Sequence, residues 1–207
     1  MKRLEALVLT VGVNAAVVEG QLAGGELECP CCGGVLAGWG WARTRVLRGG
    51  DGLVRLRPRR ARCAGCGVTH VLLPVFVLLR RVDLAEVIGA ALAAKAAGAG
   101  ARSIAAAWGR PVDTVRGWLR RFGSRAGLVR VFFTTLLVEV GVDPVPPAAA
   151  PSGFADAVAA VAGASVAAVS RWPGVGAVPP WWLAVAASGG RLLAPGWPGE
   201  PVNTSSL

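Results

Sequence analysis

Four cysteines in this chain form two Cys-x2-Cys pairs, Cys29 with Cys32 and Cys63 with Cys66, and a glycine follows each pair. Two such pairs can place four thiolates tetrahedrally around a zinc ion at about 2.3 Å. The glycines suit the tight turns, because a residue without a Cβ lets backbone N–H groups approach the sulfur atoms. The pattern therefore predicts one structural zinc ion bound by these four cysteines.

Other uses of these cysteines are weaker interpretations. Disulfides are rare in the cytoplasm, where we expect this protein. A redox dithiol at Cys29 and Cys32 would leave the second pair unexplained, and no βαβ pattern surrounds it. Two other residues remain alternative zinc ligands. Cys31 could replace Cys32, although only Cys32 gives the two-residue spacing, and His70 follows Cys66 by four residues.

The elements that must position the two pairs are strands. Trp39–Arg48 and Leu53–Arg62 both have the composition of strands, and Gly49–Gly52 is a glycine-rich turn between them. Pro58 has no N–H to donate to a ladder, which predicts that the second strand lies at a sheet edge. Two cysteine pairs joined by a hairpin make a zinc ribbon.

Arginine is concentrated on the second of these strands. With a period of two, Arg55, Arg57 and Arg59 share one face. Some of this positive charge balances the negative charge of a four-thiolate zinc site. The cluster exceeds that need, so we expect these three side chains to contact phosphates.

The distribution of charge also indicates a polyanionic partner. Residues 43–130 contain 18 basic and four acidic residues, whereas the segments before and after them each hold more acidic than basic residues. A positive surplus confined to under half of the chain is typical of a nucleic-acid-binding module.

A helix is predicted after the apolar segment 69–79. Asp83 and Glu86 form a start that resembles a capping box, and the helix is expected to end near Gly98. Its buried stripe is expected to consist of Leu84, Val87, Ile88, Ala91 and Leu92.

Residues 101–121 predict two helices joined by a tight turn. Ala105 is small where the helices would cross, Gly109 begins the turn, and Pro111 starts the second helix. With Val115 and Trp118 buried beyond it, this is the spacing of a helix-turn-helix. On the exposed side we expect Arg116 and Arg120 to reach base edges. The DNA contacts predicted for this unit are Arg102, Asp113, Thr114, Arg116, Arg120 and Arg121.

The segment from about Leu27 to Ala126 resembles an actinobacterial family of unknown function that pairs a zinc ribbon with a helix-turn-helix. The resemblance rests on CPCCGG, RRARCAGCGVTHVLLP and RSIAAAWGRPVDTVRGWLRRF, and extends into WWLAVAASGGRLLAPGW and the tail VNTSSL. The same order is similar to the front end of certain insertion-sequence transposases, where it binds the DNA ends of the element. The resemblance implies DNA binding.

One departure from those transposases matters. Their catalytic domain uses three metal-binding carboxylates, whereas only four acidic residues follow Ala126 here, two of them in a linker and a tail. A two-metal nuclease cannot be built from these, so we expect no enzymatic activity.

The predicted fold is mainly α with a small β zinc ribbon, a helix-turn-helix domain and a small helical C-terminal region. Four C-terminal tryptophans are expected to pack a small core, or else to form a partner or dimer surface, and residues 195–207 are expected to be disordered. No membrane span is expected, because prolines interrupt the longest uncharged run, Trp172–Gly190. The predicted organisation is an N-terminal segment (1–26), the ribbon (27–79), the helix-turn-helix domain (80–142), a linker (143–153) and the C-terminal region (154–207).

These features together predict sequence-specific binding of double-stranded DNA by a cytoplasmic, nucleoid-associated protein. It would act as a transposase-like DNA-binding protein or a transcriptional regulator. A homodimer stays open, since one helix-turn-helix usually needs a second contact for affinity. The alternatives are a zinc-ribbon module that binds an acidic protein partner and, less favoured, a cysteine-based redox protein. RNA binding is disfavoured because no aromatic-rich stacking strand is apparent.

Overall fold

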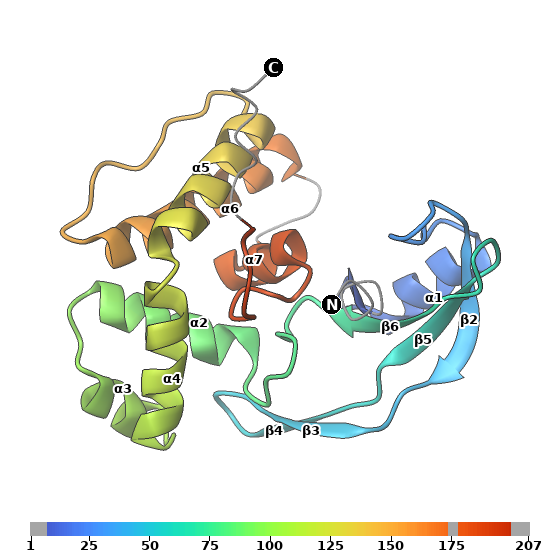
Figure 1. The fold of residues 1–207 in the computed structure, drawn as a ribbon, viewed down its shortest axis with the longest axis horizontal. Coiled ribbons are helices and arrows are strands. Elements are labelled where there is room, and N and C mark those ends of the chain that lie inside the picture. Colours follow the sequence, from blue (N-terminus) through green and yellow to red (C-terminus); the bar gives the residue numbers. More distant parts are fainter. Residues whose placement is uncertain (1–7, 174–177, 200–207) are drawn as a thin grey trace. The chain divides into compact units, whose positions relative to one another are not determined.

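The computed structural model describes residues 8–173 and 178–199. It has a mixed α/β fold with six strands and seven helices in these residues, and helices hold 45% and strands 18% of them. Strand is more extensive than the predicted hairpin, because two strands outside that hairpin join it. The chain divides into two compact units (Figure 1). They are the sheet unit (Met1–Ala85 with Val185–Gly190) and the helical unit (Glu86–Ala184 with Arg191–Leu207).

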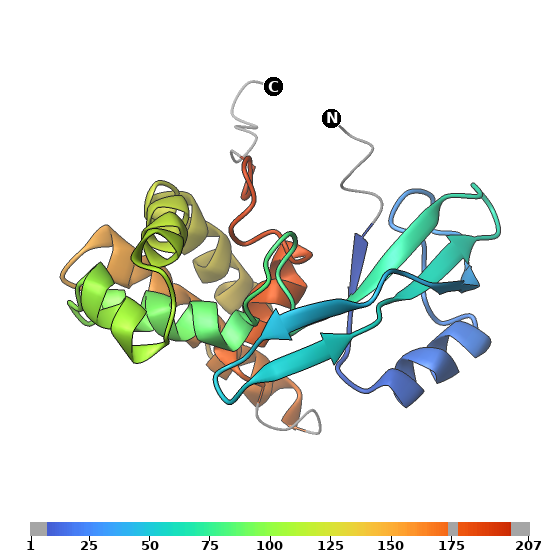
Figure 2. The same ribbon diagram turned by 90° about the horizontal axis from the view of Figure 1, so that it is seen from below.

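The sheet unit is built on four strands. In spatial order they are β1 (Val8–Val11), β6 (Thr69–Pro74), β5 (Arg59–Cys63) and β2 (Leu36–Trp41). β1 runs parallel to β6, and the other neighbours are antiparallel. Helix α1 (Ala15–Ala23) begins at Asn14, whose side chain accepts hydrogen bonds from the first turn, and α1 packs on one face of the sheet (Figure 2).

This arrangement places β1 in the same sheet as β5, which ends at Cys63. We predicted residues 1–26 as a separate segment, but β1 and α1 contribute to the core of the sheet unit. That core includes two of the four paired cysteines, so the cysteine cluster lies against it. Its buried members are Val11, Val18, Leu22, Cys29, Leu36, Ala61, Cys63 and Leu72.

The predicted hairpin is present but bent. β3 (Arg45–Arg48) pairs with β4 (Leu53–Leu56) around the predicted turn at 49–52, as a separate two-stranded sheet. Each predicted strand is broken, at 42–44 and at 57–58, and the outer halves become β2 and β5. Pro58 lies at the second break, as its missing N–H requires. The edge-strand prediction is wrong for β5, which lies between β2 and β6.

Six helices lie wholly or mostly in the helical unit. They are α2 (Ala85–Ala96), α3 (Ala101–Ala107), α4 (Val112–Gly123), α5 (Ala126–Val140), α6 (Gly153–Arg171) and α7 (Pro180–Ser188). The predicted stripe is buried on α2 at Val87, Ile88, Ala91 and Leu92, whereas Leu84 lies just before the helix and is half-buried. Gly89 on the same helix lies against the ring of Trp181, so a Cβ there would collide with it.

The C-terminal residues pack on the helices more extensively than predicted. Trp197 is buried, and its ring lies 5.1 Å from that of Phe132. Arg125 Nη1 donates a 3.1 Å hydrogen bond to the Trp197 carbonyl oxygen. The predicted disorder of residues 195–207 is therefore wrong for 195–199, and residues 200–207, with the tail VNTSSL, lie outside the described residues.

Helix α6 is the one described helix that is long and apolar enough to cross a membrane by length and composition alone. It has 19 residues, and it includes two charged residues, Asp156 in its first turn and Arg171 in its last. Its buried face packs on α5. The core helix of a globular domain passes the same test, so this finding is weak evidence for a span.

Candidate metal centre and nucleic-acid interface

Two turns of matching geometry hold the cysteine pairs. The N–H of Gly33 donates to the Cys29 carbonyl oxygen at 2.8 Å, and the N–H of Gly67 donates to that of Cys63 at 3.1 Å. Both glycines have a left-handed backbone, with φ of +70° and +71°. A side chain is strained in that conformation, which explains why glycine follows each pair.

The four paired sulfur atoms lie within 4.8 Å of one another. Sγ of Cys29 is 3.7 Å from Sγ of Cys66, and Sγ of Cys32 is 3.5 Å from Sγ of Cys63. Ligands at about 2.3 Å from a tetrahedral metal are separated by about 3.8 Å. Each of the two measured distances joins a cysteine of the first pair to a cysteine of the second pair, and each is close to this tetrahedral separation. The donor set therefore fits one metal ion, as the spacing predicted.

Backbone N–H groups approach two of the sulfur atoms. The N–H of Cys31 donates to Sγ of Cys29, and the N–H of Cys66 donates to Sγ of Cys63, both at 3.4 Å. Such donors stabilise a thiolate. Gly34 leaves room for the cluster, since a Cβ there would lie 3.1 Å from Sγ of Cys63.

The thiols of the second pair have opposite acidities. The Cys66 N–H, assisted by the Cys32 thiol, lowers the pKa of Cys63 to about 6. The Val68 N–H lowers the pKa of Cys66, but burial and the hydrogen bonds of neighbouring thiols outweigh it and raise that pKa to about 12. Without a metal, the neighbouring thiols of the cluster share a proton with the Cys63 thiolate. A bound cation would displace that proton.

His70 and Cys31 lie beside the cluster rather than within it. Nε2 of the fully buried His70 is 3.3 Å from Sγ of Cys29, a distance that suits a hydrogen bond to sulfur. Cys31 is exposed, but partial desolvation, together with the hydrogen bond and charge of the neighbouring Cys29 thiol, raises the pKa of its thiol. Cys29, Cys31 and His70 form a second group that could hold a metal, but it offers three ligands against four.

Helix α4 carries the predicted row of exposed charges. Asp113, Arg116, Arg120 and Arg121 are all exposed, while Val115, Trp118 and Phe122 are buried on the opposite side. Arg116 Nη1 lies 3.1 Å from Asp113 Oδ1, in an ion pair within the first turns of the helix. Arg102 on α3 is also exposed, and Thr114 is half-buried.

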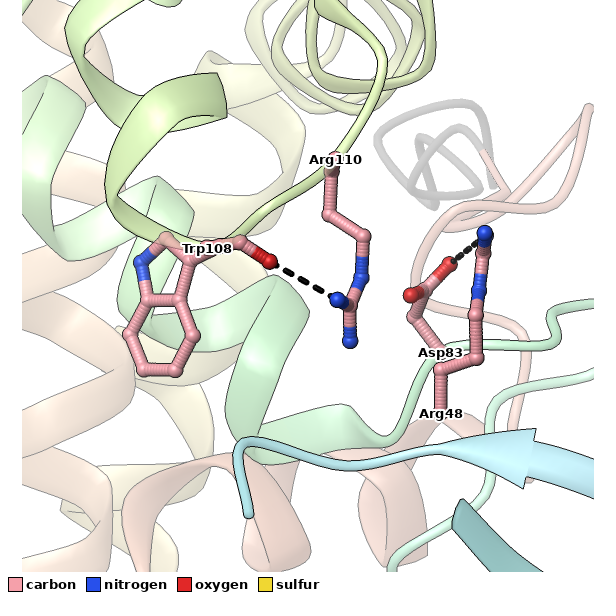
Figure 3. A network of polar contacts seen from close by, with 4 residues as sticks. All are labelled: Arg48, Asp83, Trp108 and Arg110. Atoms are coloured by element: carbon pink, nitrogen blue, oxygen red, sulfur yellow. Dashed lines mark hydrogen bonds and ion pairs between the residues drawn. The ribbon is translucent and has the colours of Figure 1, made fainter. Parts of the chain in front are cut away.

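The turn between α3 and α4 is closed by local hydrogen bonds. Gly109 has a φ of +57°, as its place in the turn predicted. Arg110 Nη1 donates to the Trp108 carbonyl oxygen at 2.7 Å (Figure 3), and the Arg110 N–H donates to the Ala105 carbonyl oxygen at 2.9 Å. Pro111 lies just before α4 and not at its first position. Gly117 is buried under Arg121, whose Nη1 donates to the Gly117 carbonyl oxygen.

The three arginines predicted to share one strand face do not do so. Arg55 is exposed on β4, Arg57 is exposed in the break after it, and Arg59 begins β5. Arg59 Nε is 2.7 Å from Glu19 Oε1 on α1, so its charge is neutralised within the protein. Period-two alternation fails here because the strand is interrupted at Pro58.

The sequence did not indicate two ion pairs of the sheet unit, nor two tryptophans that stack with arginines. Arg48 Nη2 lies 2.7 Å from Oδ2 of the buried Asp83 (Figure 3), and Arg59 binds Glu19 as above. Two exposed tryptophans on β2 are covered by guanidinium groups: Arg62 lies 4.8 Å from the centroid of Trp39, and Arg59 lies 5.0 Å from that of Trp41. The strongest signal in the sequence was the Trp-Gly-Trp segment beside an arginine-rich strand.

Residues 29–118 match the model of a family described as a domain of unknown function, DUF6431. The match includes all four paired cysteines, α2, α3 and the first half of α4. It covers fewer than half of the 207 residues. No curated protein and no solved structure matches the chain.

Proposed function

We propose that this protein binds double-stranded DNA in a sequence-specific manner, through a zinc ribbon in the sheet unit and a helix-turn-helix in the helical unit. The observation that carries the proposal is the exposed arginine row of α4. It follows a tight turn and lies opposite a buried apolar face.

Zinc is the metal that best suits the cysteine cluster. Four thiolates in tetrahedral arrangement select zinc or iron, and a closed four-ligand site is typical of structural zinc. The cluster lies against the core of the sheet unit, so the ion would stabilise that core. Its role would be to fix the two turns, and with them the strands β2, β5 and β6 that flank them.

Helices α3 and α4 have the lengths and the turn of a DNA-binding pair. α4 would be the recognition helix, because Arg116 and Arg120 lie four residues apart on its exposed side. A guanidinium group can donate two hydrogen bonds to O6 and N7 of guanine. Arg102, Arg121 and the exposed ribbon arginines would contact phosphates, which carry no sequence information.

The biological role that fits these features is a transposase-like DNA-binding protein or a transcriptional regulator without a catalytic domain. The resemblance to the front end of insertion-sequence transposases supports this class. A homodimer would supply two recognition helices for two half-sites. Such a protein would act in the cytoplasm, in association with the nucleoid.

Salt-dependent binding to duplex DNA tests the proposal. Fluorescence anisotropy should show an affinity for a labelled duplex that falls steeply as salt rises, because each phosphate contact releases counterions. Polyglutamate is an acidic polymer that has neither bases nor a double helix. It should compete only weakly with the labelled duplex for the protein. Equal competition by polyglutamate would overturn the proposal in favour of a module that binds acidic protein partners.

A further inference from the structure

A small apolar pocket in the sheet unit lies beside Trp41. Its volume is about 130 Å³, several times the roughly 30 Å³ that one water occupies in the liquid. This is smaller than the pockets that take drug-sized ligands and suits a single planar ring system. Its walls come from the β1–α1 segment, from β2 and from the break between β4 and β5, and include Val11, Val18, Glu19, Trp41, Arg57 and Leu72.

The bulge in β2 directs Trp41 to this pocket. Gly38 pairs with Ala61 and Trp41 pairs with Arg59, so β2 has one more residue than β5 between these pairs. The extra residue reverses the alternation, and Gly40 with φ of +80° absorbs it. Trp39 therefore lies on the face of Arg62, whereas Trp41 lies on the core-side face, where it lines the pocket.

One side of the Trp41 ring is covered by an arginine that is itself held by hydrogen bonds. The Arg59 guanidinium lies 5.0 Å from its ring centroid, and that guanidinium is itself fixed by bonds to Glu19 Oε1 at 2.7 Å and to the Gly40 carbonyl oxygen at 2.5 Å. Trp41 still keeps 47% of its surface exposed. A preorganised, half-exposed indole at the wall of an apolar pocket offers a stacking surface for a planar ligand.

The charge beside the pocket selects the class of ligand. Glu19 neutralises Arg59, but Arg57 is exposed with its guanidinium 5.8 Å from the Trp41 centroid, and Arg55 is exposed two residues before it. A planar apolar group joined to a polyanionic backbone is what a nucleotide offers. Proteins that bind single strands combine aromatic stacking platforms with cationic grooves in this way.

We propose that this pocket takes one unpaired base of a nucleic-acid strand, stacked on Trp41, while Arg57 contacts the adjoining phosphate. The choice of nucleic acid as the ligand rests on the proposed function. The inference extends that function from duplex recognition by α4 to a separate site that reads an unpaired or extruded nucleotide.

The test compares strands with and without bases. Fluorescence anisotropy of the full-length, metal-loaded protein would use two labelled single strands of about ten nucleotides, a length typical of such sites, one of mixed sequence and one fully abasic. Both carry the same phosphates. The wild type should bind the strand with bases more tightly, and Trp41→Ala should weaken that binding roughly 5- to 150-fold without changing the affinity for the abasic strand.

Trp39→Ala is the matched control. Trp39 lies on the same strand with 52% of its surface exposed and also has an arginine over its ring, but it does not line the pocket. This variant should keep the preference for bases. Equal binding of both strands by the wild type, or an equal loss in the two tryptophan variants, would overturn the inference. A wild type that prefers bases in single strands but does not bind duplex DNA would overturn the proposed function and leave this site standing.

Discussion

Nε2 of His70 lies 3.3 Å from Sγ of Cys29, although 41 residues separate them in the chain. β6 brings the imidazole to the cluster, and its ring is fully buried there. A buried histidine at this distance from a metal-binding thiolate orients that ligand and moderates its charge.

His70→Asn should therefore keep the bound zinc but weaken its affinity by about 10- to 100-fold, the usual effect of removing a residue that supports a ligand. Competition with a chromogenic chelator measures this. Loss of stoichiometric binding would show that His70 is itself a ligand, and an unchanged affinity would show that its contact with Cys29 is not used.

Cys63 and Cys31 should respond differently to the same substitution. The purified protein should carry about one zinc per chain, and Cys63→Ser should lose it and unfold at a lower temperature. Cys31→Ser should keep both properties, because Cys31 is exposed and lies outside the four-sulfur group. Metal analysis with thermal circular dichroism reads out both variants. A metal-free, stably folded wild type with a reversible Cys29–Cys32 disulfide would favour the redox alternative.

Zinc affinity should fall as pH falls. The pKa of Cys66 is raised to about 12, so zinc must displace its proton throughout the neutral range. The pKa of Cys63 is lowered to about 6, so its thiolate is present above that value and lost as pH falls through it. The affinity should therefore drop about tenfold per pH unit for each proton displaced, and more steeply below about pH 6. Chelator competition at several pH values measures the slope, and a flat profile would contradict thiolate ligation.

The ion pair of Arg48 and Asp83 should contribute to the stability of the sheet unit. Asp83 is 2% exposed and Arg48 is 36% exposed, so Asp83→Asn leaves a partly buried guanidinium without its counter-charge. The expected loss is about 1–3 kcal/mol of unfolding free energy, below the 3–5 kcal/mol of a fully buried pair. Urea unfolding measures it. Asp113→Asn breaks a pair that is 92% and 56% exposed and should have no measurable effect.

Local patterns in the sequence predicted much of this structure. The spacing of the cysteines, the glycine-rich turn at 49–52 and the turn at Gly109 are each encoded within a few residues. The helices α2, α3 and α4 were predicted from local patterns of apolar and turn residues, and the structure contains all three. The four sulfur atoms meet because two local turns and one hairpin are enough to bring them together.

The features that were missed depend on pairings between distant segments. The parallel pairing of β1 with β6 joins Val8 to Val71, and nothing within either short apolar run indicates it. Arg59 was predicted to contact phosphate. Its actual partner, Glu19, lies on a helix 40 residues earlier, and no local pattern around Arg59 indicates that contact. The packing of Trp197 depends in the same way on distant residues: Phe132 in α5, and Arg125, which directly precedes α5.

The central claim is that α4 reads a DNA sequence, and selection of bound fragments from random duplex DNA tests it most directly. Wild type and Arg130→Ala, which removes an exposed arginine from α5, should enrich the same motif. Arg116→Ala and Arg120→Ala should each cost about 1–3 kcal/mol on that motif and relax its preference. The same motif from the α4 variants, or no motif from the wild type, would contradict the account.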